Sequence, residues 1–171
     1  MPQVITEDRL CFTFPDNTIV SKYDEWAFYR KRFNNAFGCG TKAVDIVHID
    51  SDKTAWLIEV KDYRIHRRTK PSDLGDEIAL KVRDTLAGVA AARFGAQDLV
   101  EQSTAKKLLQ AKRLKVVLHL EQPQKASRLF PQIVNPADLK LRLQMLLKAV
   151  DARPQVVNSR TLKPTMNWAV E

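Results

Sequence analysis

The chain has 171 residues, with 28 Lys and Arg against 20 Asp and Glu, which gives a formal net charge of +8. This length favours one domain with a real hydrophobic core, and the basic balance favours polyanionic partners, nucleic acid foremost. No apolar run is long enough to span a bilayer, the N-terminus lacks a secretory pattern, and two cysteines are too few for a disulfide framework, so we expect a cytoplasmic protein without a membrane partner.

The first part of the chain predicts short strands followed by one helix. Residues 10–14 and 18–20 are short β-like stretches separated by the turn at residues 15–17. Ser21 has the chemistry of an N-cap, and the apolar residues that follow recur at helical spacing. We therefore expect a helix from about Lys22 to Phe37.

The central part predicts two strands, a basic loop and a long helix. Residues 43–49 and 54–61 have the composition of strands, and the polar turn at residues 50–53 joins them. The basic loop YRIHRRTKPSD comes next, and an apolar stripe then predicts a helix over about residues 73–94.

The last part predicts a short helix over residues 104–111, a buried strand over residues 114–120 and a helix that begins at Pro136. We expect an extended C-terminal tail over residues 154–171, although Val156 and Val157 are also compatible with a strand. The whole chain, residues 1–171, is then a single domain of α/β or α+β class, with helices flanking a small mixed sheet. The first strand of that sheet is not clearly located; residues 10–14 are one candidate.

The strand at residues 54–61 contains an acid and an amine inside an apolar run, WLIEVKDYR. Because strand side chains alternate between faces, Glu59 and Lys61 share a face with Leu57. Asp45 is the one acid within the preceding run AVDIVHI. If Asp50 pairs with Thr54 across a three-residue loop, Asp45 lies directly opposite Glu59 on the same face, and a slip of one residue would separate them.

Two carboxylates this close repel each other and are costly to bury without a neutralising charge. A hard divalent cation resolves this, because Mg²⁺ binds through one or two carboxylates completed by waters and phosphate oxygens. Lys61 beside them could orient an attacking water or stabilise charge on a phosphate. These residue types are suited to metal-assisted hydrolysis of a phosphodiester.

The pattern V-D45-x13-E59-V60-K61, on two strands followed by a helix, resembles the PD-(D/E)XK nuclease superfamily over roughly residues 21–120. The resemblance implies a restriction-endonuclease-like core and a Mg²⁺- or Mn²⁺-dependent nuclease, such as an endonuclease, that is a hydrolase. It makes Asp45 and Glu59 the acidic metal ligands, the carbonyl of Val60 a third ligand and Lys61 the catalytic lysine. Glu25, on the preceding helix, matches a glutamate found in many members. Val44 stands where the motif has proline.

The basic residues after the motif are the candidates for nucleic-acid contacts, because backbone phosphates lying across Glu59 and Lys61 would meet them. They are Arg64, Arg67, Arg68, Lys70 and, on the next helix, Lys81. The alternative for this loop is a solvated basic segment without a ligand. The three histidines lack the spacing of a zinc site, and the GCGTK stretch lacks the spacing of a P-loop.

The leading hypothesis is therefore a nuclease that acts on nucleic acid, with DNA preferred over RNA. A homodimer would fit, because cutting two strands needs two sites. The rival hypothesis is a non-catalytic module of the same fold that binds nucleic acid or another protein. Glu59 and Lys61 would then be a cross-strand ion pair. An RNA-processing enzyme or an immunity-type interaction protein is a third class that the residues leave open.

Overall fold

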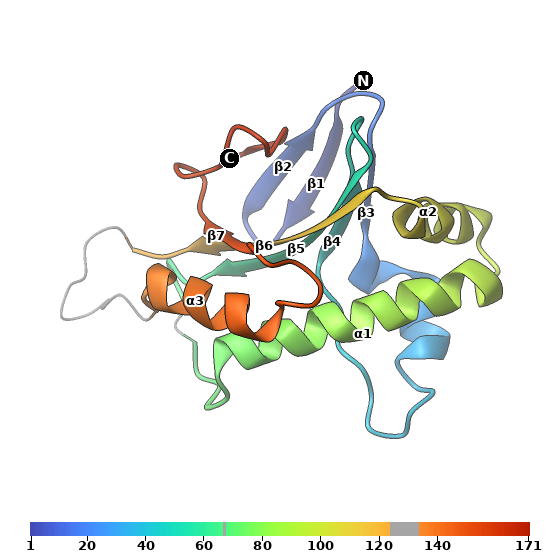
Figure 1. Cartoon of the computed structure of the whole chain (residues 1–171), viewed down its shortest axis with the longest axis horizontal. Coiled ribbons are helices and arrows are strands. Elements are labelled where there is room, and N and C mark those ends of the chain that lie inside the picture. Colours follow the sequence, from blue (N-terminus) through green and yellow to red (C-terminus); the bar gives the residue numbers. More distant parts are fainter. Residues whose placement is uncertain (67, 124–133) are drawn as a thin grey trace.

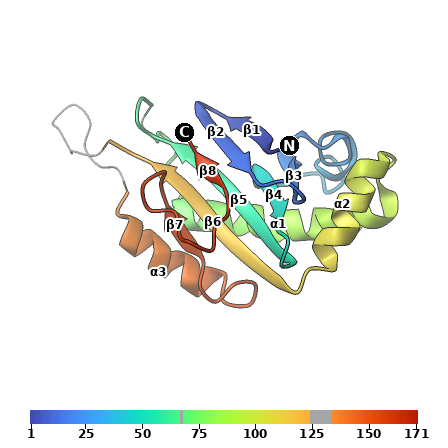
Figure 2. The same cartoon turned by 90° about the horizontal axis from the view of Figure 1, so that it is seen from above.

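The protein is described here by a computed structural model, which covers residues 1–66, 68–123 and 134–171. It has three layers: helices, a five-stranded sheet and a three-stranded sheet (Figures 1 and 2). The mixed α+β class expected from the sequence is confirmed. Within the described residues, no helix is long and apolar enough to cross a membrane.

The central sheet is mixed, as expected. The order across it is β3 (Ile19–Lys22), β4 (Ile46–Ile49), β5 (Thr54–Asp62), β6 (Arg113–Glu121) and β7 (Gln155–Val157). The pairs β3–β4 and β4–β5 are antiparallel, whereas β5–β6 and β6–β7 are parallel. The carboxyl ends of β5, β6 and β7 therefore meet at one edge of the sheet.

Three helices cover one face of this sheet: α1 (Leu74–Gly95), α2 (Leu99–Leu109) and α3 (Pro136–Leu146). Asp73 caps α1 by accepting a hydrogen bond from the backbone N–H of Asp76, which satisfies one of the free donors of the first turn. Figure 1 shows α1 running beneath the whole sheet, with α3 at the end where β5 and β6 finish and α2 at the other end.

The other face is covered by a second sheet that the sequence did not indicate. It pairs β1 (Gln3–Glu7), β2 (Leu10–Phe14) and β8 (Ala169–Val170) in antiparallel order. Aromatic side chains fill the space between the sheets, among them Phe14, Trp56 and Trp168. Residues 154–171, for which an extended tail was expected, contribute β7, the buried Trp168 and β8.

The helix expected over residues 22–37 is wrong. The chain forms a short 3₁₀ turn, η1 (Tyr23–Glu25), and a π-helical segment, η2 (Tyr29–Phe33), separated by Trp26 in extended conformation. The carboxylate of Glu101, from α2, accepts hydrogen bonds from the backbone N–H groups of Ala27 and Phe28 at 2.6 and 3.0 Å. This contact from α2 stabilises the start of the helical segment after Trp26. The spacing of nearby apolar residues cannot predict it.

Smaller differences concern element boundaries. Ser21 is not an N-cap; its hydroxyl accepts a hydrogen bond from the Trp26 indole. The first strand of the central sheet is β3, not residues 10–14, which belong to the second sheet. α2 begins at Leu99, five residues before the expected start, because Asp98 caps it there.

Candidate functional site

The β4–β5 hairpin sets the relation between the two acids of the motif. Asp50 N–H donates to the carbonyl of Thr54, which leaves a three-residue loop, and Ile46 pairs with Ile58. One further step of this register puts Asp45 opposite Glu59. The register predicted from the turn length is confirmed, and Glu59 faces the helices as expected from strand alternation.

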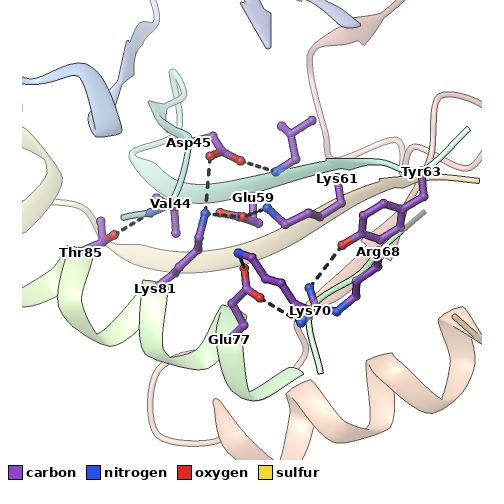
Figure 3. Close-up of polar contacts among 11 residues, drawn as sticks. Val44, Asp45, Glu59, Lys61, Tyr63, Arg68, Lys70, Glu77, Lys81 and Thr85 are labelled. Carbon is purple, nitrogen blue, oxygen red and sulfur yellow. Dashed lines mark hydrogen bonds and ion pairs between the residues drawn. The ribbon is translucent and has the colours of Figure 1, made fainter. Parts of the chain in front are cut away.

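Glu59 is the centre of a compact charged group. Its side chain is 1% exposed, and its Oε1 accepts hydrogen bonds from Lys61 Nζ at 2.5 Å and from Lys81 Nζ at 2.6 Å (Figure 3). The other oxygen, Oε2, is buried and has no hydrogen-bond partner among the described residues. We call Asp45, Glu59, Lys61 and Lys81 the carboxylate–lysine cluster.

Asp45 connects this cluster to the backbone of β5. Its Oδ2 accepts a hydrogen bond of 2.7 Å from the N–H of Val60, and its Oδ1 lies 3.7 Å from Lys81 Nζ. Lys81 thus reaches both carboxylates from α1, one turn beyond Glu77. The cluster contains two carboxyl groups and two amines. Pairing opposite charges in this way lowers the free-energy cost of burying each of them.

The electrostatics of the cluster are dominated by burial. Burial raises the pKa of Glu59 to about 7, the nearby Asp45 carboxylate adds to the rise, and Lys61 and Lys81 oppose it. Burial alone would lower the pKa of Lys61, but the charge and hydrogen bond of Glu59 outweigh it, so that the pKa is raised. Lys61 is therefore a fixed positive charge, whereas Glu59 changes its protonation state near neutral pH.

A second charged group lies beside the first and holds the basic loop. Glu77, buried on α1, pairs with Arg68 Nη2 at 3.0 Å and with Lys70 Nζ at 3.3 Å (Figure 3). Arg68 also donates to the carbonyl of Ser72, and its side chain is only 9% exposed. Lys70 is different, because its side chain remains 63% exposed. Arg68 is thus a structural anchor, and Lys70 presents its charge to solvent.

The other residues predicted for the site are dispersed. Arg64 is exposed and donates through Nε and Nη2 to the carboxylate of Asp62. Arg67 lies outside the described residues. Glu25 is half exposed and pairs with Lys22 at 3.0 Å and Arg30 at 4.0 Å; no contact joins it to the cluster within the described part of the chain.

Asp24, next to Glu25, is the acid of this turn with a buried carboxylate oxygen. The backbone N–H of Tyr23 donates to the carbonyl of Asp45, which brings η1 against the start of β4. Burial raises the pKa of Asp24 to about 6, and the carboxylate of Asp45 is the next cause of the rise. The family resemblance pointed to Glu25, which is exposed, whereas the Oδ1 atom of the neighbouring Asp24 is buried.

Asp24 and Glu77 were not foreseen from the sequence, and Lys81 was foreseen only as a phosphate contact. The four-residue spacing of Glu77 and Lys81 on α1 puts them on one helix face, which was the signal available. What the spacing could not supply is the rotation of α1 that directs this face toward β5.

The acids of the cluster fit a cation only as a two-carboxylate site. In the described ranges, no three His, Cys, Asp or Glu side chains are grouped to hold a metal ion. Mg²⁺ needs fewer protein ligands than this, because water and the phosphates of a bound molecule complete its shell. The buried Oε2 of Glu59, which has no partner in the described part of the chain, is an oxygen of the required kind.

Comparison with known proteins gives one informative relationship. No family model matches the chain, and no solved structure matches it. The chain is 36% identical, over 165 aligned positions, to the cysteine--tRNA ligase of Neisseria meningitidis serogroup A, strain Z2491. The match covers 79% of this chain and 23% of the ligase, so the chain spans less than a quarter of the length of that relative. If the match is one continuous stretch covering 79% of the chain, it contains residues 45–81, and therefore the carboxylate–lysine cluster, whichever end it leaves out.

This match contradicts the nuclease hypothesis. The relative is a tRNA ligase by name, and the assignments of nuclease, endonuclease and hydrolase drawn from the motif are not supported by it. The relative is an enzyme by its name, but that name is not the name of a nuclease. The expectation of a homodimer depended on the cutting of two strands, so the argument for it no longer applies. The superfamily resemblance itself remains a prediction, because no family model or structure tests it.

Proposed function

We propose that this chain is an RNA-binding module of tRNA-ligase type, with tRNA as its ligand. The 36% identity to a cysteine--tRNA ligase is the observation that carries the proposal. The match covers 23% of that protein, so we assign the module only one step of such an enzyme's function. That step is the binding of the RNA. This reading develops the rival hypothesis of a nucleic-acid-binding module and prefers RNA to DNA.

The charge of the chain supports a polyanionic ligand. A net charge of +8 favours phosphate backbones, and the edge near the cluster contributes exposed positive groups. Lys70 is 63% exposed, and Arg64 is exposed while its guanidinium is oriented by Asp62. An RNA backbone at this edge would contact the charges of Lys70 and Arg64, and the less exposed Lys61 lies deeper in the protein.

The fold that we propose for this module is a restriction-endonuclease-like core used for binding. The order β4, β5, α1, β6, with the cluster on β5 and α1, supports this arrangement. Lys81 pairs with both carboxylates of the cluster, and Lys61, the most exposed of its four side chains, would present its charge to a ligand.

Mg²⁺ (or Mn²⁺) is proposed as an auxiliary ion that Asp45 and Glu59 would hold together with phosphate oxygens. Its positive charge would reduce the repulsion between these carboxylates and an RNA backbone. Lys81 now supplies this compensation to both acids, so the ion would compete with its ammonium group.

The proposal is tested by fluorescence anisotropy with a labelled tRNA transcript, a single-stranded DNA of equal length and a DNA duplex. We expect the tRNA to bind most tightly, and Lys70→Gln to weaken binding several-fold. Lys106→Gln, an exposed substitution on α2 at the other end of the sheet, is the matched control and should change nothing.

Two results would overturn the proposal: equal affinity for the tRNA and the DNAs, or equal weakening by Lys106→Gln. The same tRNA, incubated with the protein and Mg²⁺ and run on a denaturing gel, should remain intact. A separate titration with Mg²⁺ or EDTA tests the ion. Mg²⁺ should tighten binding to the wild type more than to Asp45→Asn, and equal effects would remove Mg²⁺ from the proposal.

A further inference from the structure

One cavity lies at the end of the central sheet where the parallel strands finish. Arg64 follows β5, residues 121–123 end and follow β6, and residues 158–160 follow β7, and all of them line one cavity of about 720 Å³. Small-molecule sites commonly have about 300–1,000 Å³. In open sheets with parallel strands, ligands bind in the crevice outside the carboxyl ends of the strands. We call this cavity the strand-end pocket.

The lining of the strand-end pocket combines three kinds of group. Arg64 and Arg160 are exposed cations in its lining. Apolar surface comes from Leu120 and the two prolines 123 and 136. Hydrogen-bonding groups come from Glu121, Asn158 and Ser159. An anion, a flat apolar body and a polar edge are the three parts of a nucleotide, and each kind of group suits one of them.

The polar wall of the pocket is already held in place by internal hydrogen bonds. Glu121 Oε1 accepts from the backbone N–H of Ser159 at 2.7 Å and lies 3.0 Å from Nε2 of His119. Asn158 Oδ1 accepts from the backbone N–H groups of Arg160 and Thr161. Asp62 fixes the guanidinium of Arg64 through two contacts. A pocket ordered before binding loses less entropy when the ligand enters.

The pocket also adjoins the carboxylate–lysine cluster. Lys61 pairs with Leu120 across β5 and β6, and Leu120 lines the pocket. A strand of nucleic acid whose backbone passes Lys61 can therefore reach the pocket within the span of neighbouring nucleotides. We propose that the strand-end pocket binds one nucleotide, with its phosphate at Arg160 and Arg64 and its base against the two prolines and the polar wall. The identity of this nucleotide as a unit of RNA rests on the function proposed above.

The test uses free nucleotides and the intact chain. Titration calorimetry with the four nucleoside 5′-monophosphates, adenosine and inorganic phosphate measures the pocket directly. We expect at least one monophosphate to bind, with adenosine and phosphate each weaker by roughly tenfold or more, because each lacks one half of the contacts. Arg160→Gln should weaken the monophosphate by a similar factor. Arg153→Gln, an exposed substitution before β7 that is not in the pocket lining, is the matched control.

Binding of tRNA is measured in parallel, so that the two proposals fail separately. If tRNA binds but no monophosphate does, or if Arg160→Gln binds monophosphates as the wild type does, the pocket assignment is wrong while the RNA-binding function stands. If a monophosphate binds in an Arg160-dependent manner but tRNA does not, the pocket stands as a nucleotide site and the RNA-binding function falls. Equal binding of adenosine and its monophosphate would remove the phosphate contact from the assignment.

Discussion

The carboxylate of Glu59 and the ammonium of Lys81 are 2.6 Å apart, although 22 residues separate them in the chain. This contact ties α1 to the centre of β5 and supplies half of the positive charge around a fully buried acid. Lys61, two residues from Glu59 on the same strand, supplies the other half. The stability of the helix–sheet interface at this point is therefore coupled to the ionisation of one side chain.

Lys81→Met should destabilise the fold by about 2–4 kcal/mol, because it leaves the buried Glu59 with a single cationic partner. Urea unfolding at pH 8, where Glu59 is charged, measures the loss. Lys106→Met on the exposed face of α2 is the control, with an expected change within about 0.5 kcal/mol. In the double variant Glu59→Gln/Lys81→Met the second change should cost much less than in the wild-type background, and additive losses would contradict the coupling.

Glu59 should contribute a fall in the free energy of unfolding as the pH rises from about 4.5 to about 7, whereas the buried His48 and His119, whose pKa values burial lowers, contribute a rise below pH 6.5. The folded state raises the pKa of Glu59 from 4.5 to about 7, so it binds more protons than the unfolded state within this window, and stability is lost toward its upper end. Asp45, Lys61 and Lys81 are the charged groups that face Glu59, and Asp24 adds a change of the same sign up to pH about 6.

Glu59→Gln removes this contribution, so between pH 6 and 7.5 the variant should lose less stability with rising pH than the wild type does. Chemical denaturation at half-unit pH intervals gives both curves. An unchanged slope in the variant would show that other groups determine the pH dependence.

Gly88→Ala should destabilise the protein by about 1–3 kcal/mol through overpacking. A Cβ at this position on α1 would lie 1.9 Å from the hydroxyl oxygen of Tyr23 and 3.2 Å from the ring of Phe33. Tyr23→Phe removes the nearer atom, whose hydroxyl has no partner within the described ranges, so this variant alone should cost little. Thermal unfolding of both single variants and the double variant is the measurement; no partial rescue in the double variant would contradict the contact.

Lys70→Gln should reduce the slope of log K for tRNA binding against log salt concentration by about one, if Lys70 meets one phosphate. Its exposure distinguishes it from Arg68, which is buried against Glu77. Anisotropy titrations at four salt concentrations give the slope, and Lys163→Gln, at an exposed site in the C-terminal segment, is the control. Parallel lines for the Lys70 variant and the wild type would mean that Lys70 makes no phosphate contact.

The hairpin of the site was predictable because its register depends on local features. A three-residue loop and the alternation of side chains were enough to place Asp45 opposite Glu59. The strands β5 and β6 and the helices α1 and α3 were predictable for a similar reason, since each has a long or strongly apolar pattern. Tertiary packing preserves these elements because the apolar residues that form each pattern are also the residues that pack in the core.

The parts that failed depend on distant contacts. The break at Trp26 is stabilised by Glu101, which lies more than 70 residues away, and in the turn before it Asp24 has a buried carboxylate oxygen while Glu25 is exposed. β1 is largely exposed and β8 is only two residues long, so neither has a pattern of its own; both exist because β2 pairs with them. The function inferred from the motif failed at a different level, because a few residue types in a given order do not determine the reaction.

The pairing of β2 with β8 has a consequence for the order of folding. Phe12 and Thr13 pair with Val170 and Ala169, and Cys11 and Glu171 exchange two backbone hydrogen bonds. The second sheet therefore joins segments about 160 residues apart, and closing so long a loop is slow. During synthesis, residues 10–14 must wait for residues 169–171 to leave the ribosome before their sheet can be completed. Until then Trp56 of β5 and Val117 of β6, which pack in the cluster between the two sheets, lack part of their cover, so this apolar face stays open to water while the chain is being made.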